Sequence, residues 1–315
     1  RLMRALENKG GLSRAIEYLP DDQALVERQA AGEGLTRPEI AMLVSYAKHD
    51  LYQQLLDSAL PEDPCLMPEL ERYFPTPLRQ RFAEHIHTHR LRREILASSV
   101  ANRVINRTGS TFVFRLQEEL GVDAAAAIRA YVVAWEVFGM RRLWSAVAEL
   151  DNRVPERLQR QMLSSAARLL ARSSRWLLKN GEGGTAVVER IERYRSRVQE
   201  LGMQLPELAD EGYRTVLEES AALLCEEGVP ADLAGWVAGF ELLSRAFDLV
   251  EVAEAAGWKW LRARGSISLW ARPWSWIGWS AISLPCLPGT VGSPRPGPLS
   301  VTTCWGIIAR CARRC

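Results

Sequence analysis

The chain has 315 residues and a formal net charge of +2. This length is sufficient to bury a substantial core and allows one large or two moderate domains. The charge is uneven, because residues 1–254 hold all 38 acidic residues against 32 basic ones, whereas residues 255–315 hold eight basic and no acidic residues. A net acidic body argues against nucleic-acid binding, which needs a concentrated basic surface.

The cysteines exclude a disulfide framework in the body of the chain. Only Cys65 and Cys225 precede residue 257, and so few cysteines are typical of a reducing cytosol. The sequence opens with Arg1 and shows no charged and then apolar leader. We therefore expect a cytoplasmic protein, and a piece cut from a longer one.

Helical periodicity begins at the first residues and extends to about residue 257. No run of alternating polar and apolar residues indicates a strand, so the expected fold class is all-α. A short helix is expected over 2–8, ending at the glycine pair 10–11, and a second from Ser13 to about Leu19, where Pro20 follows.

Residues 34–56 predict a complete helix whose start is encoded in the sequence. Thr36 can act as N-cap and Glu39 can complete a capping box, in which each side chain accepts a hydrogen bond from the other residue's backbone N–H. Pro38 suits the first turn, where its fixed φ is helical and its missing N–H has no partner to lose. The predicted buried stripe consists of Ile40, Leu43, Val44, Ala47, Leu51 and Leu55.

The body as a whole predicts an array of roughly ten helices joined by short loops. Residues 61–77 contain five prolines and indicate a jointed connector with a short helix over 69–73. Asp123 is a predicted N-cap, and Gly109 and Gly181 are predicted helix ends. The remaining helices are expected over 77–89, 91–106 (separate from 77–89 or fused to it), 110–120, 124–138, 143–150, 155–180, 185–201, 206–226, 231–240 and 241–256.

The helices divide into two parts of one helical domain, residues 1–180 and residues 185–257. The link between them, Gly181-Glu182-Gly183-Gly184, superficially resembles a phosphate-cradling loop. It lacks the preceding strand and the spacing of a dinucleotide motif. We interpret it as a helix end and a linker.

Three histidines, His85, His87 and His89, are the only candidates for a metal site. His85 and His89 lie four residues apart, hence on one helical face, and Glu84 precedes the first of them. A zinc site needs three or four converging ligands, and the sequence suggests no further one. A solvated or capping role near a helix end is favoured, and no metal is expected.

Two other sets of polar side chains are candidates for binding. Arg90, Arg92 and Arg93 could meet phosphates, but on a net acidic body a salt-bridge patch between helices or domains is the favoured interpretation. Asn102 and Asn106 lie four apart on a mostly apolar helix, which favours buried hydrogen bonding or capping of a neighbour over substrate binding.

No spacing in the chain supports a Ser/His/Asp set or a pocket of paired carboxylates. We therefore predict no catalytic, cofactor-binding or metal-binding residue. Trp135, Trp144 and Trp176 are predicted core anchors, because large aromatic side chains on helical stripes usually pack inside.

Six phrases, in a fixed order along the chain, carry a family resemblance. They are RLMRALENKGGLSRAIEYLPDD (1–22), GLTRPEIAMLVSYAK (34–48), YFPTPLRQRFAEHIHTHRLRREILASSVANRVINRTGSTFVFRL (73–116), AYVVAWEVFGMRRLW (130–144), LDNRVPERLQ (150–159) and RWLLKN (175–180). Together they resemble the C-terminal helical region of the large bacterial NAD-specific glutamate dehydrogenases, the long-chain class. The likeness continues more weakly to about residue 257.

The resemblance implies a function for the parent protein rather than for any residue in this chain. In that family the catalytic lysine and aspartate, and the glycine-rich turn that holds NAD, lie upstream of this region. The parent is expected to deaminate L-glutamate oxidatively to 2-oxoglutarate and ammonia with NAD. This region is expected to pack on the parent's catalytic domain in a homo-oligomer, with a structural, assembly or regulatory role and no cofactor. The alternative is a free-standing α-helical interaction or scaffold module.

Residues 258–315 depart from the resemblance. They contain seven of the eleven tryptophans and four of the six cysteines. Our hypothesis is that this tail is translated from GC-rich coding sequence in a shifted frame and is disordered. The alternative is a membrane-interface anchor over 270–279. A spanning helix is disfavoured because Pro273 and Pro285 interrupt a short apolar run, so no membrane partner is expected.

Overall fold

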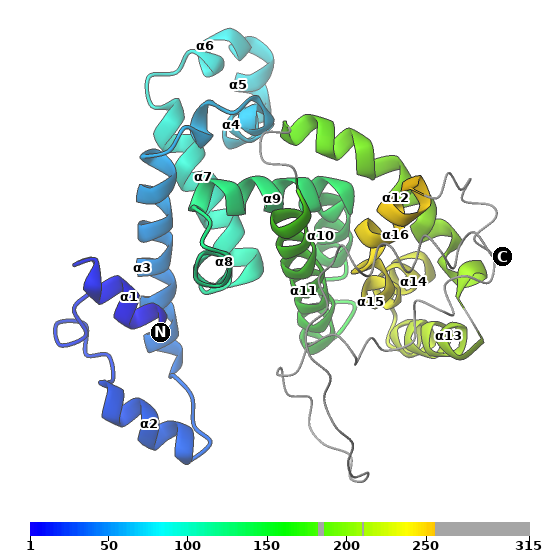
Figure 1. Cartoon of the computed structure of the whole chain (residues 1–315), viewed down its shortest axis with the longest axis horizontal. Helices are drawn as coiled ribbons and strands as arrows, with labels where there is room; N and C mark the ends of the chain where they lie inside the picture. The colour runs from blue at the N-terminus through cyan, green and yellow to red at the C-terminus, as the bar shows by residue number, and fades with distance from the viewer. Residues whose placement is uncertain (182–185, 210, 256–315) are drawn as a thin grey trace.

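The computed structural model describes residues 1–181, 186–209 and 211–255 (Figure 1). Within these ranges there are 16 α-helices, two short 3-10 helices and no strand. The all-α prediction is confirmed. The helices outnumber the roughly ten expected, and two predicted elements, 77–89 and 241–256, are each divided into two shorter helices.

The helices follow one another along the chain with short connections. In chain order they are α1 (Leu2–Asn8), α2 (Asp22–Ala30), α3 (Arg37–Leu56), η1 (Leu60–Glu62), η2 (Pro64–Leu66), α4 (Met67–Tyr73), α5 (Thr76–Arg81), α6 (Ala83–His87), α7 (Arg92–Thr108), α8 (Phe112–Leu120), α9 (Ala124–Val137), α10 (Met140–Ala148), α11 (Glu156–Asn180), α12 (Val187–Leu208), α13 (Glu211–Glu226), α14 (Ala231–Ala238), α15 (Phe240–Leu243) and α16 (Ala246–Ala255).

Helix α9 lies at the centre of the array. Ten of its fourteen residues are buried, and it packs against α3, α8, α10, α11 and α12. Its alanines allow neighbouring helices to approach, and Ile128, Tyr131 and Trp135 fill the space between them. Asp123 caps the helix as predicted, accepting a hydrogen bond from Ala126 N at 2.6 Å.

Helix α3, the long blue helix in Figure 1, packs along α7. The predicted capping box is confirmed: Thr36 N donates to Glu39 Oε2 at 2.7 Å, and Glu39 N donates to Thr36 Oγ1 at 3.5 Å. Four members of the predicted stripe are buried, namely Leu43, Ala47, Leu51 and Leu55. Ile40 is 47% exposed, so its assignment to the buried face was wrong.

The second predicted helix, from Ser13 to Leu19, was wrong. This segment forms turns in which Leu19 N donates to Arg14 O at 2.9 Å, and Tyr18 has a positive φ of 52°. The helix in this region is α2, which begins after Asp21. This helix could not be predicted from hydrophobic periodicity, because none of its residues is buried and it therefore has no apolar stripe.

Two other predicted boundaries were wrong. The helix expected over 77–89 is broken at Phe82, whose φ of −134° is not helical, into α5 and α6. The break expected between 201 and 206 does not occur, and α12 continues to Leu208. Leu205 and Leu208 are each 4% exposed, so burial of this last turn holds the longer helix together.

Helices on both sides of residues 182–185 share one core. The Phe247 ring of α16 lies 5.2 Å from the Trp176 ring of α11, 4.8 Å from Tyr194 of α12 and 5.6 Å from Phe138. The glycine-rich link at 182–184 and the anomalous tail at 258–315, with its two alternative interpretations, lie outside the described residues. No helix in the described part has the length and apolar character that crossing a bilayer requires.

Candidate functional site

The three candidate metal ligands point to different neighbours. His87 Nε2 lies 2.9 Å from Glu71 Oε1, His89 Nδ1 accepts a hydrogen bond from Leu91 N at 3.1 Å, and His85 packs edge-on against Phe82. Across the described ranges no group of three or more His, Cys, Asp or Glu side chains is placed to hold a metal ion. The described geometry therefore gives these histidines surface and capping contacts.

Two of the three candidate phosphate-binding arginines belong to a salt-bridge patch, as predicted. Arg92 Nη2 and Arg93 Nη1 pair with Glu62 at 2.9 and 2.7 Å. Arg93 also donates to the carbonyl oxygen of Leu56 at 2.8 Å. These contacts join the start of α7 to the end of α3, whereas Arg90 is exposed.

The prediction for Asn102 and Asn106 was wrong, because both residues are exposed on α7. On α7 the residues that follow the two asparagines, Arg103 and Arg107, lie nearer the buried apolar face and are partly buried. The side chain of Arg103 is only 17% exposed. The inward polar groups of this helix are thus arginines rather than amides.

The tryptophan prediction is confirmed. Trp135 is 3% exposed, and Trp144 and Trp176 are partly buried against the core. Trp135 and Trp144 also hold a cation: the Arg107 guanidinium lies 4.5 Å from the first ring centroid and 4.9 Å from the second. Such contacts stabilise a cation that is partly removed from water.

One carboxylate meets three arginines where α4, α7 and α10 converge, and a fourth arginine, Arg107, lies nearby on α7. Glu69 contacts Arg72 on its own helix and Arg103 on α7, and Arg141 Nη2 of α10 lies 3.4 Å from Glu69 Oε1. The Glu69 side chain is 11% exposed. We call Arg72, Arg103, Arg107 and Arg141 the arginine cluster, and sequence reasoning missed all four.

Two buried aromatic side chains bring polar groups to the arginine cluster. Tyr131 is 1% exposed and Trp135 is 3% exposed, and neither the Tyr131 hydroxyl nor the Trp135 Nε1–H has a hydrogen-bond partner among the described residues. Burial raises the pKa of Tyr131, and the nearby charges of Arg103, Arg107 and Arg141 oppose this rise. The Tyr131 hydroxyl therefore lies close to three cations.

Burial also acts on the arginines themselves. It lowers the pKa of Arg103 to about 10, with the charges of Arg141 and Arg107 adding to the effect, and it lowers the pKa of Arg107. The Arg103 guanidinium is still a cation at neutral pH, because its pKa remains well above 7. The cluster thus concentrates positive charge in a poorly solvated place.

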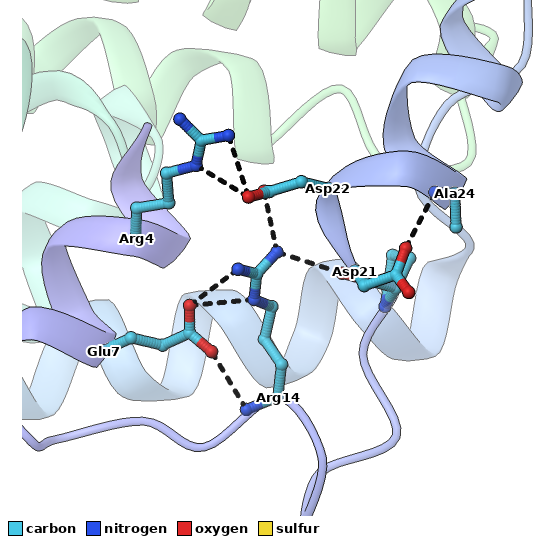
Figure 2. A network of polar contacts seen from close by, with 7 residues as sticks. Arg4, Glu7, Arg14, Asp21, Asp22 and Ala24 are labelled. Carbon is cyan, nitrogen blue, oxygen red and sulfur yellow. Dashed lines mark hydrogen bonds and ion pairs between the residues drawn. The ribbon is translucent and has the colours of Figure 1, made fainter.

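A second polar network lies at the N-terminal end and is balanced in charge (Figure 2). Arg14 donates to Glu7 Oε2 at 2.8 Å and to Asp22 Oδ1 at 3.0 Å, and Arg4 Nη2 pairs with Asp22 at 2.8 Å. Arg14 Nη1 also reaches the carbonyl oxygen of Pro20 at 3.4 Å. The network ties α1 and the following turns to the start of α2.

The aromatic side chains around Phe247 differ from Tyr131 and Trp135 in having paired polar groups. Trp176 Nε1 donates to Asp248 at 2.6 Å, and the Tyr194 hydroxyl donates to Glu251 at 2.5 Å. Both acceptors lie on α16, which these bonds fix against α11 and α12. The polar groups of this region therefore serve the packing of the three helices.

The described residues define an all-α helical domain, and comparison with known proteins gives its family. A family model described as glutamate dehydrogenase, C-terminal, matches residues 32–265. The chain therefore belongs to the family of glutamate dehydrogenase C-terminal regions, which confirms the resemblance drawn from the sequence.

Three relatives agree with this assignment, each an NAD-specific glutamate dehydrogenase. The chain is 36% identical over 257 residues to the Pseudomonas aeruginosa protein, covering 82% of this chain and 16% of that protein. It is 37% identical to the Halomonas elongata protein, covering 80% and 16%. Identity to the Mycobacterium tuberculosis protein is 34%, covering 71% and 14%. The chain thus spans about a sixth or less of the length of these relatives.

Proposed function

We propose that the chain is a helical domain of an NAD-dependent glutamate dehydrogenase and serves its assembly or regulation. The parent reaction is the conversion of L-glutamate, NAD and water to 2-oxoglutarate, ammonia and NADH. The observation that carries the proposal is the family match over residues 32–265 in a chain that corresponds to only 14–16% of each relative. Catalysis is assigned to other parts of the parent.

The described residues do not fit a nicotinamide dinucleotide. The usual site is a glycine-rich turn between a strand and a helix, where backbone N–H groups at the helix N-terminus meet the pyrophosphate. No strand occurs within the described ranges. We therefore derive no step through NAD in this domain.

Exposed apolar side chains support docking of the catalytic part on this domain. Tyr18 is 92% exposed, Ile16 is 73% exposed and Val26 is 65% exposed, in the region of α1 and α2 that projects at one end of the molecule (Figure 1). Contiguous patches of exposed apolar groups are typical of surfaces that meet another protein surface, and in the proposal these side chains belong to such a patch. In the proposal they contact the catalytic part, and the parent assembles as a homo-oligomer.

The first test compares the chain with the protein encoded by the complete gene. The complete protein is expected to form NADH when glutamate and NAD are supplied, and residues 1–315 alone are expected to form none and to bind no NAD in calorimetry. Turnover by residues 1–315 alone would place an active site in this domain and overturn the proposal. A start codon directly before Arg1 would instead support a free-standing interaction module.

The second test addresses the docking face in the complete protein. Tyr18→Ser is expected to weaken assembly, measured by sedimentation, without changing the stability of the isolated chain, because the ring is almost fully solvated there. Met203→Ser on α12, 78% exposed, is the matched control and should assemble normally. Equal behaviour of both variants would remove the docking assignment.

A further inference from the structure

The arginine cluster holds more positive than negative charge. Three of its four guanidinium groups share one contacting carboxylate, that of Glu69, and the fourth, Arg107, lies against Trp135 and Trp144. The charge of Glu136 acts on Arg72 and Arg103 and that of Glu71 acts on Arg72, but within the described residues neither carboxylate forms an ion pair with the cluster, and Glu136 accepts from Arg195 at 2.7 Å. Holding like charges together in a poorly solvated place is unfavourable unless anions compensate them.

Hydrogen-bond donors in the cluster also outnumber acceptors. Arg107 Nη1, the Tyr131 hydroxyl and the Trp135 Nε1–H are buried and lack partners within the described part of the chain. A buried donor without an acceptor loses its hydration and gains nothing in return. Three such donors within one cluster of cations indicate that an acceptor with negative charge belongs there.

We propose that the arginine cluster, with the Tyr131 hydroxyl and the Trp135 indole N–H, is a binding site for a phosphate group. Guanidinium groups match phosphate oxygens through paired N–H donors, and a phosphate dianion can accept from several directions at once. Arg107 lies against two tryptophan rings whose centroids are 5.1 Å apart and is thus pre-oriented for a ligand. This inference goes beyond the proposed function and does not depend on the parent's reaction.

Two arginines give the site access to solvent. The Arg72 side chain is 37% exposed and that of Arg141 is 48% exposed, whereas Arg103 lies deeper at 17%. In the proposal a phosphate approaches from the side of this outer pair. Glu69 competes with it for the same guanidinium groups, so the affinity depends on how far this carboxylate can be displaced.

The experiment is a titration of the 315-residue chain with inorganic phosphate at constant ionic strength, with chloride as the replaced anion. A ligand that binds only the folded state stabilises it by RT ln(1 + [L]/Kd), so the urea midpoint should rise with the logarithm of the phosphate concentration once that concentration exceeds the dissociation constant. Calorimetry gives the dissociation constant independently. A rise that is linear in the phosphate concentration, with no binding in calorimetry, would reflect the general effect of phosphate on protein surfaces and would overturn the proposal.

Variants locate the site. Arg107→Leu is expected to weaken phosphate binding by at least about tenfold, because it removes a charge-assisted donor. Arg141→Leu, at a half-exposed position, tests the same site if Arg107→Leu does not fold. Glu69→Gln removes the competing carboxylate and should strengthen binding.

A control arginine makes the result specific. Arg160 on α11 is 67% exposed and pairs only loosely with Glu156 at 3.5 Å, so Arg160→Leu should bind phosphate like the original chain. Binding that is equal in Arg107→Leu, Arg141→Leu and the original chain would overturn the proposal. If the 315-residue chain binds phosphate but the complete protein forms no NADH from glutamate and NAD, only the proposed function is contradicted.

Discussion

The N-terminal network around Arg14 and the arginine cluster around Glu69 are built from the same residue types, but the first is balanced in charge and the second is not. In the first, one guanidinium meets two carboxylates and a carbonyl oxygen (Figure 2). In the second, one carboxylate meets three guanidinium groups, and a fourth, Arg107, lies beside them. Every strong donor of Arg14 has an acceptor nearby, whereas the cluster holds donors that have none among the described residues.

The difference teaches what each network does for the molecule. The Arg14 network joins α1 to α2, where apolar burial is scarce because α2 buries no residue. The arginine cluster lies beside α9, where the apolar core already fixes the helices. In a network that joins two helices, each donor has an acceptor within the protein. A network on a rigid frame whose donors lack acceptors is suited to bind a ligand that supplies them.

Removing Glu69 should give the largest effect. Breaking a fully buried charge pair costs about 3–5 kcal/mol, and we expect about 2 kcal/mol for Glu69→Gln because Arg72 and Arg141 reach solvent. Urea unfolding in chloride buffer measures the loss. Glu7→Gln in the Arg14 network is the matched change. It should lower the free energy of unfolding less, since Arg14 still pairs with Asp22. Equal losses in the two variants would show that the two networks do not differ in this way.

Removing one hydroxyl from each aromatic region should lower the free energy of unfolding in one region and not in the other. Tyr194→Phe loses the bond to Glu251 and is expected to cost about 1 kcal/mol. Tyr131→Phe removes a buried hydroxyl that has no partner among the described residues, so stability in phosphate-free buffer should stay equal or rise by up to about 1 kcal/mol. A clear loss in Tyr131→Phe would show that its hydroxyl is already satisfied.

Most of the fold could be predicted because periodicity and caps are local signals. The core of α3, α9 and α11 follows from apolar residues at helical spacing, and the Thr36 and Asp123 caps follow from side chains that compete for backbone N–H groups. The helix α2 could not be found in this way. Ion pairs from Arg14 to Asp22 and from Arg28 to Glu39 join it to its neighbours, and it has no fully buried residue that would mark an apolar face.

The candidate site was not predicted because the candidates on α7 were chosen by residue type rather than by their position relative to the buried face of the helix. On α7 the positions Leu96, Val100, Arg103 and Arg107 follow each other at steps of four, three and four, so they share a face, and the first two are buried. This spacing predicts that Arg103, rather than Asn102, lies on the buried face. The convergence of α4, α7 and α10 on one carboxylate is a tertiary feature that no local pattern encodes.

The smallest expected effect concerns Asp22 and tests whether the Arg14 network is as complete as its geometry indicates. Hydrogen bonds from Arg4 and then Arg14 lower the pKa of Asp22 from 3.8 to about 2. Because the folded-state pKa lies below the unfolded one, Asp22 contributes stability above about pH 4 and loses it as the pH falls toward 2. Carboxyl-carbon NMR should show this titration directly. Arg14→Met should raise the pKa of Asp22 toward 3.8, and Arg160→Met should leave it unchanged. A pKa that stays near 2 in Arg14→Met would assign the shift to Arg4 alone and reduce the network to a simple pair.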